Sequence, residues 1–444
     1  MYHPPYFIPH RVRLTIMISL IASFFIISPL LILYTTGYRY DWRNHVFLTT
    51  GVLSIEGDPR DMDVFINDIQ IEKTVPIRLT NLTPNTYRVR LEKAGYITWE
   101  KDVTVESNKT SYIKHIGLIR KTEPVALPSV QRFTSFALSY DGAHMLGMTQ
   151  STTNTFALSL FNAETKKETP LSIITASTSP YMEWSPYDAS ALISWKDVAG
   201  QHIRLVSGER AGETDAIALP GESVIRTQWD SSESLHLFFA DRDEIFSLTS
   251  DGANFLVRLP VASAPWYIDG SRHLWTYDAD RGAVTETVDG NVKESYATDQ
   301  PIDRFVHVNN KRIVAHHENM IDIVERTSPP RVQRIQAESV TFNSGTHEWI
   351  VWSPWELWTI YEDGNATLLN RTGDPIQFVR PLDDFGVLLV ATQNSLTAFN
   401  PGYYVTQKIL DVSNIREVRV HQKQRKILFT KTSEGTEELF ELNY

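Results

Sequence analysis

The hydropathy pattern has its strongest feature near the N-terminus, where no charged residue occurs between Leu14 and Tyr34. A helix of this length covers about 30 Å at 1.5 Å per residue, which matches the hydrocarbon core of a bilayer. The apolar run is longer than the roughly 7 to 15 residues of a signal-peptide core, and no small-residue cleavage site follows it. The pattern therefore favours an uncleaved transmembrane helix over residues 14–34 rather than a cleaved signal peptide.

Basic residues precede this run and aromatic residues follow it. The residues that we assign to the membrane interface are Arg11, Arg13, Tyr34, Tyr38, Tyr40 and Trp42. Basic residues concentrate on the cytoplasmic side of a membrane, and Tyr and Trp concentrate at the boundary between lipid and water. We therefore expect residues 1–13 to be a cytoplasmic tail, residues 35–50 to be a juxtamembrane linker, and the bulk of the chain to be extracytoplasmic.

After the linker, the hydrophobic residues alternate with a period of two, which is typical of strands. About six short strands occur between residues 51 and 119, and this density predicts a small β-sandwich. Two prolines mark residues 120–130 as a second linker. Both β regions lack an amphipathic helical pattern, so the predicted fold class is an all-β ectodomain behind one transmembrane helix.

Residues 131–444 contain a repeated element of three or four strands with polar turns. The turns that end its first strand include Asp141-Gly142, Asp188, Asp230 and Asp269-Gly270. The element recurs about every 40 residues, a spacing typical of four-stranded propeller blades. The spacing predicts a β-propeller with seven or eight blades.

Both β regions resemble known families. The segments Gly51-Val-Leu-Ser-Ile, Val64-Phe-Ile-Asn-Asp and Lys93-Ala-Gly95-Tyr96 resemble the PEGA domain. Trp184-Ser185-Pro186 and Ser139-Tyr-Asp141-Gly142 resemble TolB-like and WD-type β-propellers. The chain thus resembles membrane-anchored PEGA domain proteins of bacteria with a C-terminal propeller. This resemblance implies an extracytoplasmic accessory module that binds carbohydrate or protein.

Composition excludes several classes of function. The formal net charge is −11, with 53 acidic and 42 basic residues and no basic block. Nucleic acid is therefore an unexpected partner, because phosphate backbones need clustered positive charge. The chain has no cysteine, which rules out disulfides and thiolate chemistry.

The chain also lacks contiguous catalytic motifs, because it contains no nucleophile elbow, no HExxH and no Walker loop. His316 and His317 are adjacent, so a strand would point them to opposite faces. The stretch from Asp278 to Gly282 lacks the later ligands of a calcium loop and predicts a polar hairpin turn instead. We therefore expect no catalytic residue, no metal site and no cofactor.

The expected function is that of a non-enzymatic binding or scaffold protein of the cell envelope. Its partners would be the lipid bilayer and an envelope protein or wall polysaccharide. The alternative is a propeller enzyme, a glycosidase, lyase or peptidase-like protein, with carboxylates facing the central channel. A cluster of histidine and carboxylates converging in the channel would favour the enzyme. The sequence leaves the ligand and the oligomeric state open.

Overall fold

The structure is a computed structural model, and its chain forms two compact units, Met1–Lys121 and Thr122–Tyr444. It describes residues 9–35, 37–41, 46–127, 133–219, 226–261, 264–327, 329–343, 345–361, 365–433 and 436–444.

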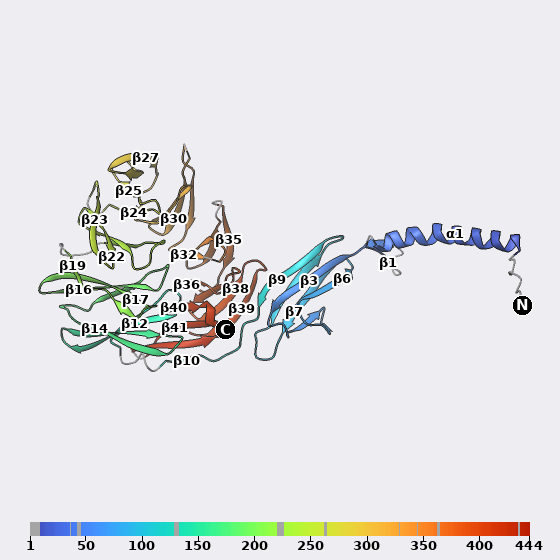
Figure 1. Ribbon diagram of the computed structural model, residues 1–444, viewed down its shortest axis with the longest axis horizontal. Helices are drawn as coiled ribbons and strands as arrows, with labels where there is room; N and C mark the ends of the chain where they lie inside the picture. The colour runs from blue at the N-terminus through green and yellow to red at the C-terminus, as the bar shows by residue number, and fades with distance from the viewer. Residues whose placement is uncertain are drawn as a thin grey trace, which may run out of the picture. The chain divides into compact units, whose positions relative to one another are not determined.

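The first unit begins with helix α1 (His10–Thr35), which contains the whole predicted span (Figure 1). Its most apolar window has a mean hydropathy of 2.6 and is not buried within the unit. The helix is long and apolar enough to cross a bilayer. The chain therefore has an N-terminal helix that can anchor it in a membrane.

The stretch expected to be a linker, residues 35–50, contains a short antiparallel hairpin. It is formed by β1 (Tyr38–Asp41) and β2 (Val46–Thr49), with Tyr38 opposite Thr49. The Thr50 N–H donates to the carbonyl of Gly37 over 2.9 Å, and the Asn108 N–H donates to the carbonyl of Thr50 over 3.0 Å. The first bond closes the base of the hairpin and the second joins it to the turn between β8 (Trp99–Val105) and β9 (Thr110–Gly117), so the segment folds back instead of extending.

Two sheets form the rest of this unit. One contains β3 (Gly51–Asp58), β6 (Ile77–Leu82) and β9 (Thr110–Gly117), and the other contains β4 (Asp63–Ile66), β5 (Ile69–Ile71), β7 (Asn85–Glu92) and β8 (Trp99–Val105). Alternate residues of β3 are buried, and Leu53, Val64, Leu91 and Trp99 belong to the apolar core. The expected β-sandwich is confirmed, because each sheet buries one face, as period-two strands require.

The described residues of the second unit form eight sheets that follow one another in chain order (Figure 1). Blade 1 contains β11 (Ser135–Leu138), β12 (His144–Thr152), β13 (Thr155–Asn162) and β14 (Lys167–Thr175). Blade 2 contains β15 (Tyr181–Trp184), β16 (Ser190–Asp197), β17 (Gly200–Ser207), β18 (Gly212–Glu213) and β19 (Ile217–Ala218). Blade 3 contains β20 (Arg226–Trp229), β21 (Leu237–Asp241), β22 (Glu244–Thr249) and β23 (Gly252–Arg258). Blade 4 contains β24 (Trp266–Ile268), β25 (Leu274–Asp278), β26 (Ala283–Val288) and β27 (Asn291–Ala297).

The remaining sheets complete the ring. Blade 5 contains β28 (Arg304–Val308), β29 (Arg312–His317), β30 (Met320–Glu325) and β31 (Val332–Gln336). Blade 6 contains β32 (Ser339–Asn343), β33 (Glu348–Trp352), β34 (Glu356–Ile360) and β35 (Ala366–Arg371). Blade 7 contains β36 (Ile376–Pro381), β37 (Leu388–Thr392), β38 (Ser395–Asn400) and β39 (Val405–Asp411). Blade 8 contains β40 (Ile415–His421), the 3-10 turn η2 (Gln422–Gln424), β41 (Lys426–Ser433), β42 (Thr436–Asn443) and β10 (Val125–Ala126).

Strand β10 closes the ring, because it comes from the start of the unit and pairs with the last strand of the chain. Val125 lies opposite Glu441, and Ala126 lies opposite Phe440. The segment expected to be a plain linker, residues 120–130, thus supplies the outer strand of blade 8. The fold prediction is confirmed as an all-β propeller, and the sheets in the described residues number eight.

The first strands of neighbouring blades contact one another, as β11 and β15, β24 and β28, and β36 and β40 do. These strands therefore form the inner ring around the central channel. In seven of the eight blades, as far as the chain is described, an Asp or Asn caps the turn after the first strand by accepting the N–H two residues further on. The capping residues are Asp141, Asp188, Asp230, Asp269, Asn309, Asn343 and Asp383.

Candidate functional site

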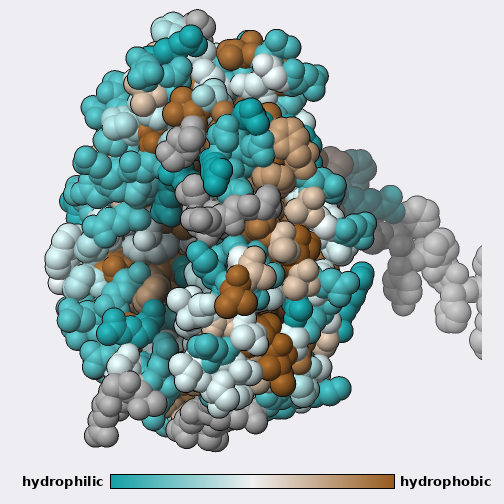
Figure 2. Space-filling view, turned by 90° about the vertical axis from the view of Figure 1, so that its left-hand side faces the viewer, coloured by the Kyte–Doolittle hydropathy of each residue, from teal (hydrophilic) through white to brown (hydrophobic). Residues whose placement is uncertain are grey.

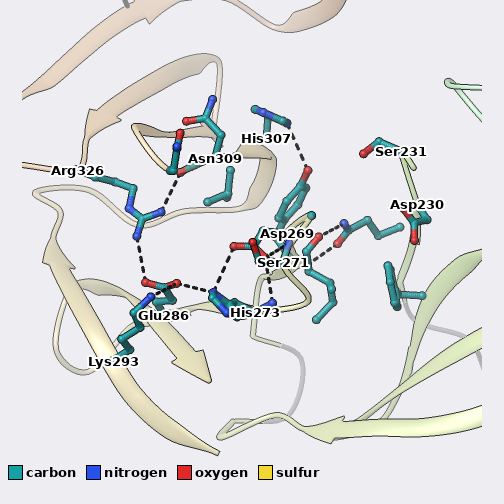
Figure 3. Close-up of a pocket in the computed structure, with 17 residues that line it drawn as sticks. Asp230, Ser231, Asp269, Ser271, His273, Glu286, Lys293, His307, Asn309 and Arg326 are labelled. Atoms are coloured by element: carbon teal, nitrogen blue, oxygen red, sulfur yellow. Dashed lines mark hydrogen bonds and ion pairs between the residues drawn. The ribbon is translucent and has the colours of Figure 1, made fainter. Parts of the chain in front are cut away.

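A polar pocket of about 460 Å³ lies where blades 3, 4 and 5 meet (Figure 3). Its lining comes from the ends of the first strands β20, β24 and β28, from the turns that follow them and from the turn after β30, together with side chains on β21, β26 and β27. Because antiparallel strands alternate in direction, these turns all lie on one face of the propeller. The lining residues are Gln228, Asp230, Ser231, Phe238, Tyr267, Ile268, Asp269, Gly270, Ser271, His273, Glu286, Lys293, His307, Val308, Asn309, Asn310 and Arg326.

Asp269 shapes the turn at the centre of this pocket. Its Oδ1 accepts the backbone N–H groups of Ser271 and His273, each over 2.9 Å. Its Oδ2 accepts the indole N–H of Trp275 over 2.9 Å. Both carboxylate oxygens thus accept hydrogen bonds that hold the turn. The conformation of this turn directs the His273 ring toward Glu286 (Figure 3).

Glu286 on β26 is a carboxylate with 1% of its side chain exposed. Its Oε1 lies 2.7 Å from His273 Nδ1 and 3.4 Å from Lys293 Nζ, and its Oε2 lies 3.1 Å from Arg326 Nη2. A buried carboxylate is stable only when opposite charge and hydrogen bonds compensate its desolvation. Three nitrogen groups supply that compensation, so Glu286 is a fixed member of an ion-pair network.

Arg326 extends this network along the wall of the pocket. Its guanidinium lies over the ring of Trp275, with Cζ 4.7 Å from the ring centroid, and its Nη2 lies 3.0 Å from Glu294. Hydrogen bonds to Glu294 from the Tyr296 hydroxyl and from Arg326 lower the pKa of Glu294. Arg326 therefore forms ion pairs with two carboxylates.

A second cluster contains Asp230, Glu233 and His236 from blade 3. His236 Nδ1 lies 2.8 Å from Asp230 Oδ2 and 3.1 Å from Glu233 Oε2. Arg272 of blade 4 joins both carboxylates, at 2.9 Å from Asp230 and 3.1 Å from Glu233. Burial acts to raise the pKa of Asp230, but hydrogen bonds from Ser232 and the charge of Arg272 outweigh it, and the pKa is lowered.

Both clusters meet a geometric condition for a metal ion. The ligand atoms of Asp230, Glu233 and His236, and those of Asp269, His273 and Glu286, lie within 4.8 Å of one another in each group. In each group, however, an arginine already contacts at least one carboxylate, so a cation would have to displace a fixed positive charge. The donor sets therefore fit internal ion pairs better than a metal, and the expectation of no metal site stays a prediction.

Neutral polar groups make up much of the remaining lining. The Tyr267 hydroxyl lies 3.4 Å from His307 Nδ1, and burial raises the pKa of Tyr267 and lowers the pKa of His307. Both side chains are therefore uncharged near neutral pH. The Gln228 amide joins two blades, because it donates to the carbonyl of Ile268 over 2.7 Å and accepts the N–H of Ile268 over 2.8 Å.

The sequence analysis assigned no functional role to any of these pocket residues, although it placed turns at Asp230 and Asp269. Two of its negative expectations can be compared with the structure. Asp278 caps a hairpin turn by accepting the N–H groups of Asp280 and Arg281, and His317 is buried whereas His316 is half-buried. Neither stretch belongs to the groups of metal-ligating side chains found among the described residues, and the expectation that these two stretches bind no metal stays a prediction.

The residues assigned to the membrane interface lie in or beside the helix. Arg11 and Arg13 are in the first turn of α1, and Tyr34 is in its last turn. Tyr38 and Tyr40 are on β1, and the Tyr40 ring packs against Phe47 with the centroids 5.1 Å apart. Trp42 lies outside the described residues. Their placement at the membrane remains a prediction.

Fold and site together define a β-propeller protein with an N-terminal apolar helix that can anchor it in a membrane. Residues 50–116 match the model of the PEGA domain family, which covers the sandwich of the first unit. No curated protein matches the chain. The PEGA part of the sequence resemblance is thus confirmed for that segment.

Solved structures with propeller folds are similar to the chain at low identity. A streptogramin B lyase is 14% identical with a TM-score of 0.37, over 65% of this chain and 97% of the lyase. The Hsv2 protein of Kluyveromyces lactis is 12% identical with a TM-score of 0.33, over 44% of this chain and 66% of Hsv2. Likenesses at this level carry no argument about function, and the propeller follows from the strand pairing of the chain itself.

Proposed function

We propose that the protein is a single-pass, membrane-anchored binding protein of the bacterial cell envelope. Its N-terminus lies in the cytoplasm, and the propeller outside the cytoplasm binds a wall polysaccharide in the pocket between blades 3, 4 and 5. The protein acts without catalysing a reaction. The apolar helix and the PEGA segment support the location, and the pocket supports the ligand.

The observation that carries this proposal is the state of the charged groups in the pocket. Asp269 uses both oxygens to hold its turn, and Glu286 is neutralised by His273, Lys293 and Arg326. A general acid or base needs an available proton position in reach of the substrate. The groups that remain for a ligand are hydroxyls, amides and neutral rings, which suit the many hydroxyl groups of a sugar because these both donate and accept.

Size and surface character favour a glycan over a protein partner for this site. A volume of about 460 Å³ is within the range of sites that enclose a small ligand unit. The side of the molecule that carries β14, β16 and β23 is mostly hydrophilic, with apolar side chains in small groups (Figure 2). Stable protein interfaces need a well-packed apolar core, whereas the apolar side chains that are visible on that side form only small groups.

Binding of wall-polysaccharide fragments to the full-length protein in detergent micelles tests the proposal. The variant His307→Phe keeps a ring but removes the polar edge, and Asn310→Leu removes an amide from the lining. We expect each to weaken binding about tenfold, the effect of losing roughly 1.4 kcal/mol. Asn254→Leu, at an exposed position on β23, is the control and should bind normally. Equal binding by all four proteins would refute the proposed site.

One observation favours a second candidate, a propeller glycosidase. Oxygens of Asp269 and Glu286 lie within 4.8 Å of each other, close to the separation of about 5 Å between the carboxyl groups of retaining glycosidases. This candidate predicts that the protein shortens its polysaccharide and that Glu286→Gln stops the cleavage while binding persists. Intact glycan after prolonged incubation with the wild-type protein would exclude it.

A further inference from the structure

Tyr140 lies across the central channel of the propeller. It belongs to the turn that follows β11 in blade 1, yet its hydroxyl hydrogen-bonds the hydroxyl of Thr341 on β32 of blade 6. Blades 1 and 6 are not neighbours in a ring of eight, so this contact can form only through the middle. The Tyr140 ring also faces two arginines, with Cζ of Arg380 at 5.5 Å and Cζ of Arg419 at 5.7 Å from its centroid.

These two arginines have more positive charge than their surroundings neutralise. Arg380 on β36 donates from Nη1 to the carbonyl of Val379 over 2.8 Å, and its buried Nε has no hydrogen-bond partner. Among the residues that the structure describes, no carboxylate forms an ion pair with Arg380. Because an arginine in a protein stays protonated, Arg380 is a buried cation without a direct counter-charge, which is a costly arrangement.

Arg419 on the neighbouring β40 is only partly compensated. Its Nη2 lies 2.6 Å from Glu417 Oε1, and its buried Nε also lacks a partner. Burial raises the pKa of Glu417 although both arginines act to lower it. One carboxylate that is itself desolvated thus faces two guanidinium groups, and the cluster keeps a net positive charge.

We propose that Arg380, Arg419 and Tyr140 form a channel site for an anionic group, a carboxylate or a phosphate, carried by a ligand that enters the channel. Two unpaired Nε–H donors on neighbouring first strands offer charge-assisted hydrogen bonds, the kind that arginine forms with both groups. Binding would give Arg380 the ion-pair partner that it lacks among the described residues. The site is separate from the pocket at blades 3, 4 and 5 and does not depend on that pocket's ligand.

The test measures the apparent Tm of the full-length protein in a nonionic detergent. Inorganic phosphate and glucuronate are the probes, sodium chloride at equal ionic strength corrects for screening, and glucose is the uncharged counterpart of glucuronate. A ligand that binds the folded state raises its Tm. We expect a rise of about 2 °C or more with at least one anionic probe, whereas glucose and chloride have no effect. The probe that acts distinguishes a carboxylate ligand from a phosphate ligand.

Variants assign the effect to the site. Arg380→Met should abolish the anion-dependent rise and, in chloride, should increase Tm by about 1 to 3 °C, because it removes an uncompensated buried charge. Arg416→Met, at an exposed arginine on β40, the strand that carries Arg419, should keep the wild-type response. If Arg380→Met does not fold, Arg380→Lys is the deciding variant, since loss of the planar fork should weaken anion binding at least tenfold and so reduce the rise in Tm. The proposal is wrong if neither anion raises the wild-type Tm, or if the Arg380 variant responds like the wild type.

Discussion

The pocket at blades 3, 4 and 5 and the arginine cluster at blades 7 and 8 both bury charged side chains, but they differ in how far opposite charges compensate them. In the pocket, Glu286 contacts three nitrogen groups, and Arg326 contacts two carboxylates. In the channel, Arg380 lacks an ion pair within the described residues, and Arg419 has one.

This difference separates two roles of buried charge. A network whose members compensate one another has no need of a ligand, and its removal harms stability. A buried cation without an ion-pair partner lowers the free energy of unfolding, and a bound anion that pairs with it can restore that stability. The comparison therefore predicts opposite responses to substitution in the two regions.

The largest effect is expected at Glu286. Replacement by alanine removes the buried carboxylate that pairs with His273, Lys293 and Arg326, and breaking a buried pair typically costs about 3 to 5 kcal/mol. Urea unfolding followed by tryptophan fluorescence measures the loss. Glu294→Ala, which removes a 42% exposed partner of the same arginine, should cost less than about 1 kcal/mol. Comparable losses in the two variants would contradict the assignment of Glu286 as the centre of the network.

The next effect concerns Trp275, which is fully buried and donates to Asp269. Trp275→Phe keeps an aromatic ring but leaves a small cavity and removes the donor to that carboxylate. We expect a loss of about 1 to 3 kcal/mol in the free energy of unfolding. Trp355→Phe, at a 53% exposed tryptophan, should change it by less than about 0.5 kcal/mol. If Trp275→Phe and Trp355→Phe unfolded at the same urea concentration, the turn at Asp269 would not depend on the Trp275 indole.

A smaller effect is expected for Tyr140→Phe in the channel. The change removes the hydroxyl that bonds Thr341 and keeps the ring beneath both arginines, so it should cost about 1 kcal/mol. The anion-dependent rise in Tm should remain, because the arginines supply it. Tyr404→Phe, at an exposed tyrosine, is the matched control. If Tyr140→Phe no longer showed the anion-dependent rise in Tm, the hydroxyl rather than the guanidinium groups would be the group that binds the anion.

The smallest expected effect is the change in stability with pH that His307 causes. Burial lowers the folded-state pKa of His307, which faces the Tyr267 hydroxyl and the Trp349 ring. The unfolded state therefore takes up the proton first, so stability is full above about pH 6.5 and falls as the pH drops below it. The apparent Tm should fall between pH 7.5 and 5.5, and it should fall less in His307→Phe. A slope unchanged by the substitution would assign the effect to other groups, such as His144 and His316, whose pKa values burial also lowers.

Local patterns in the chain predicted much of the architecture. The charge-free run predicted helix α1, because an apolar segment of that length has few other stable environments. Period-two alternation predicted the strands, and Asp141, Asp188, Asp230 and Asp269 predicted the turns that their side chains do cap. These features depend on neighbours within a few residues, so the sequence alone carries them.

The sequence determined the N-terminal apolar helix, the two β regions and the repeat of the blades. Only the tertiary structure decided that the described ring has eight sheets, that residues 125–126 close it, and that the hairpin occupies the expected linker. It alone brought Asp269, Glu286 and Arg326 together, and it alone placed Tyr140 against Thr341, Arg380 and Arg419. Each group joins residues of more than one blade, and no local pattern records such pairs, because the closure of the ring sets which blades face one another.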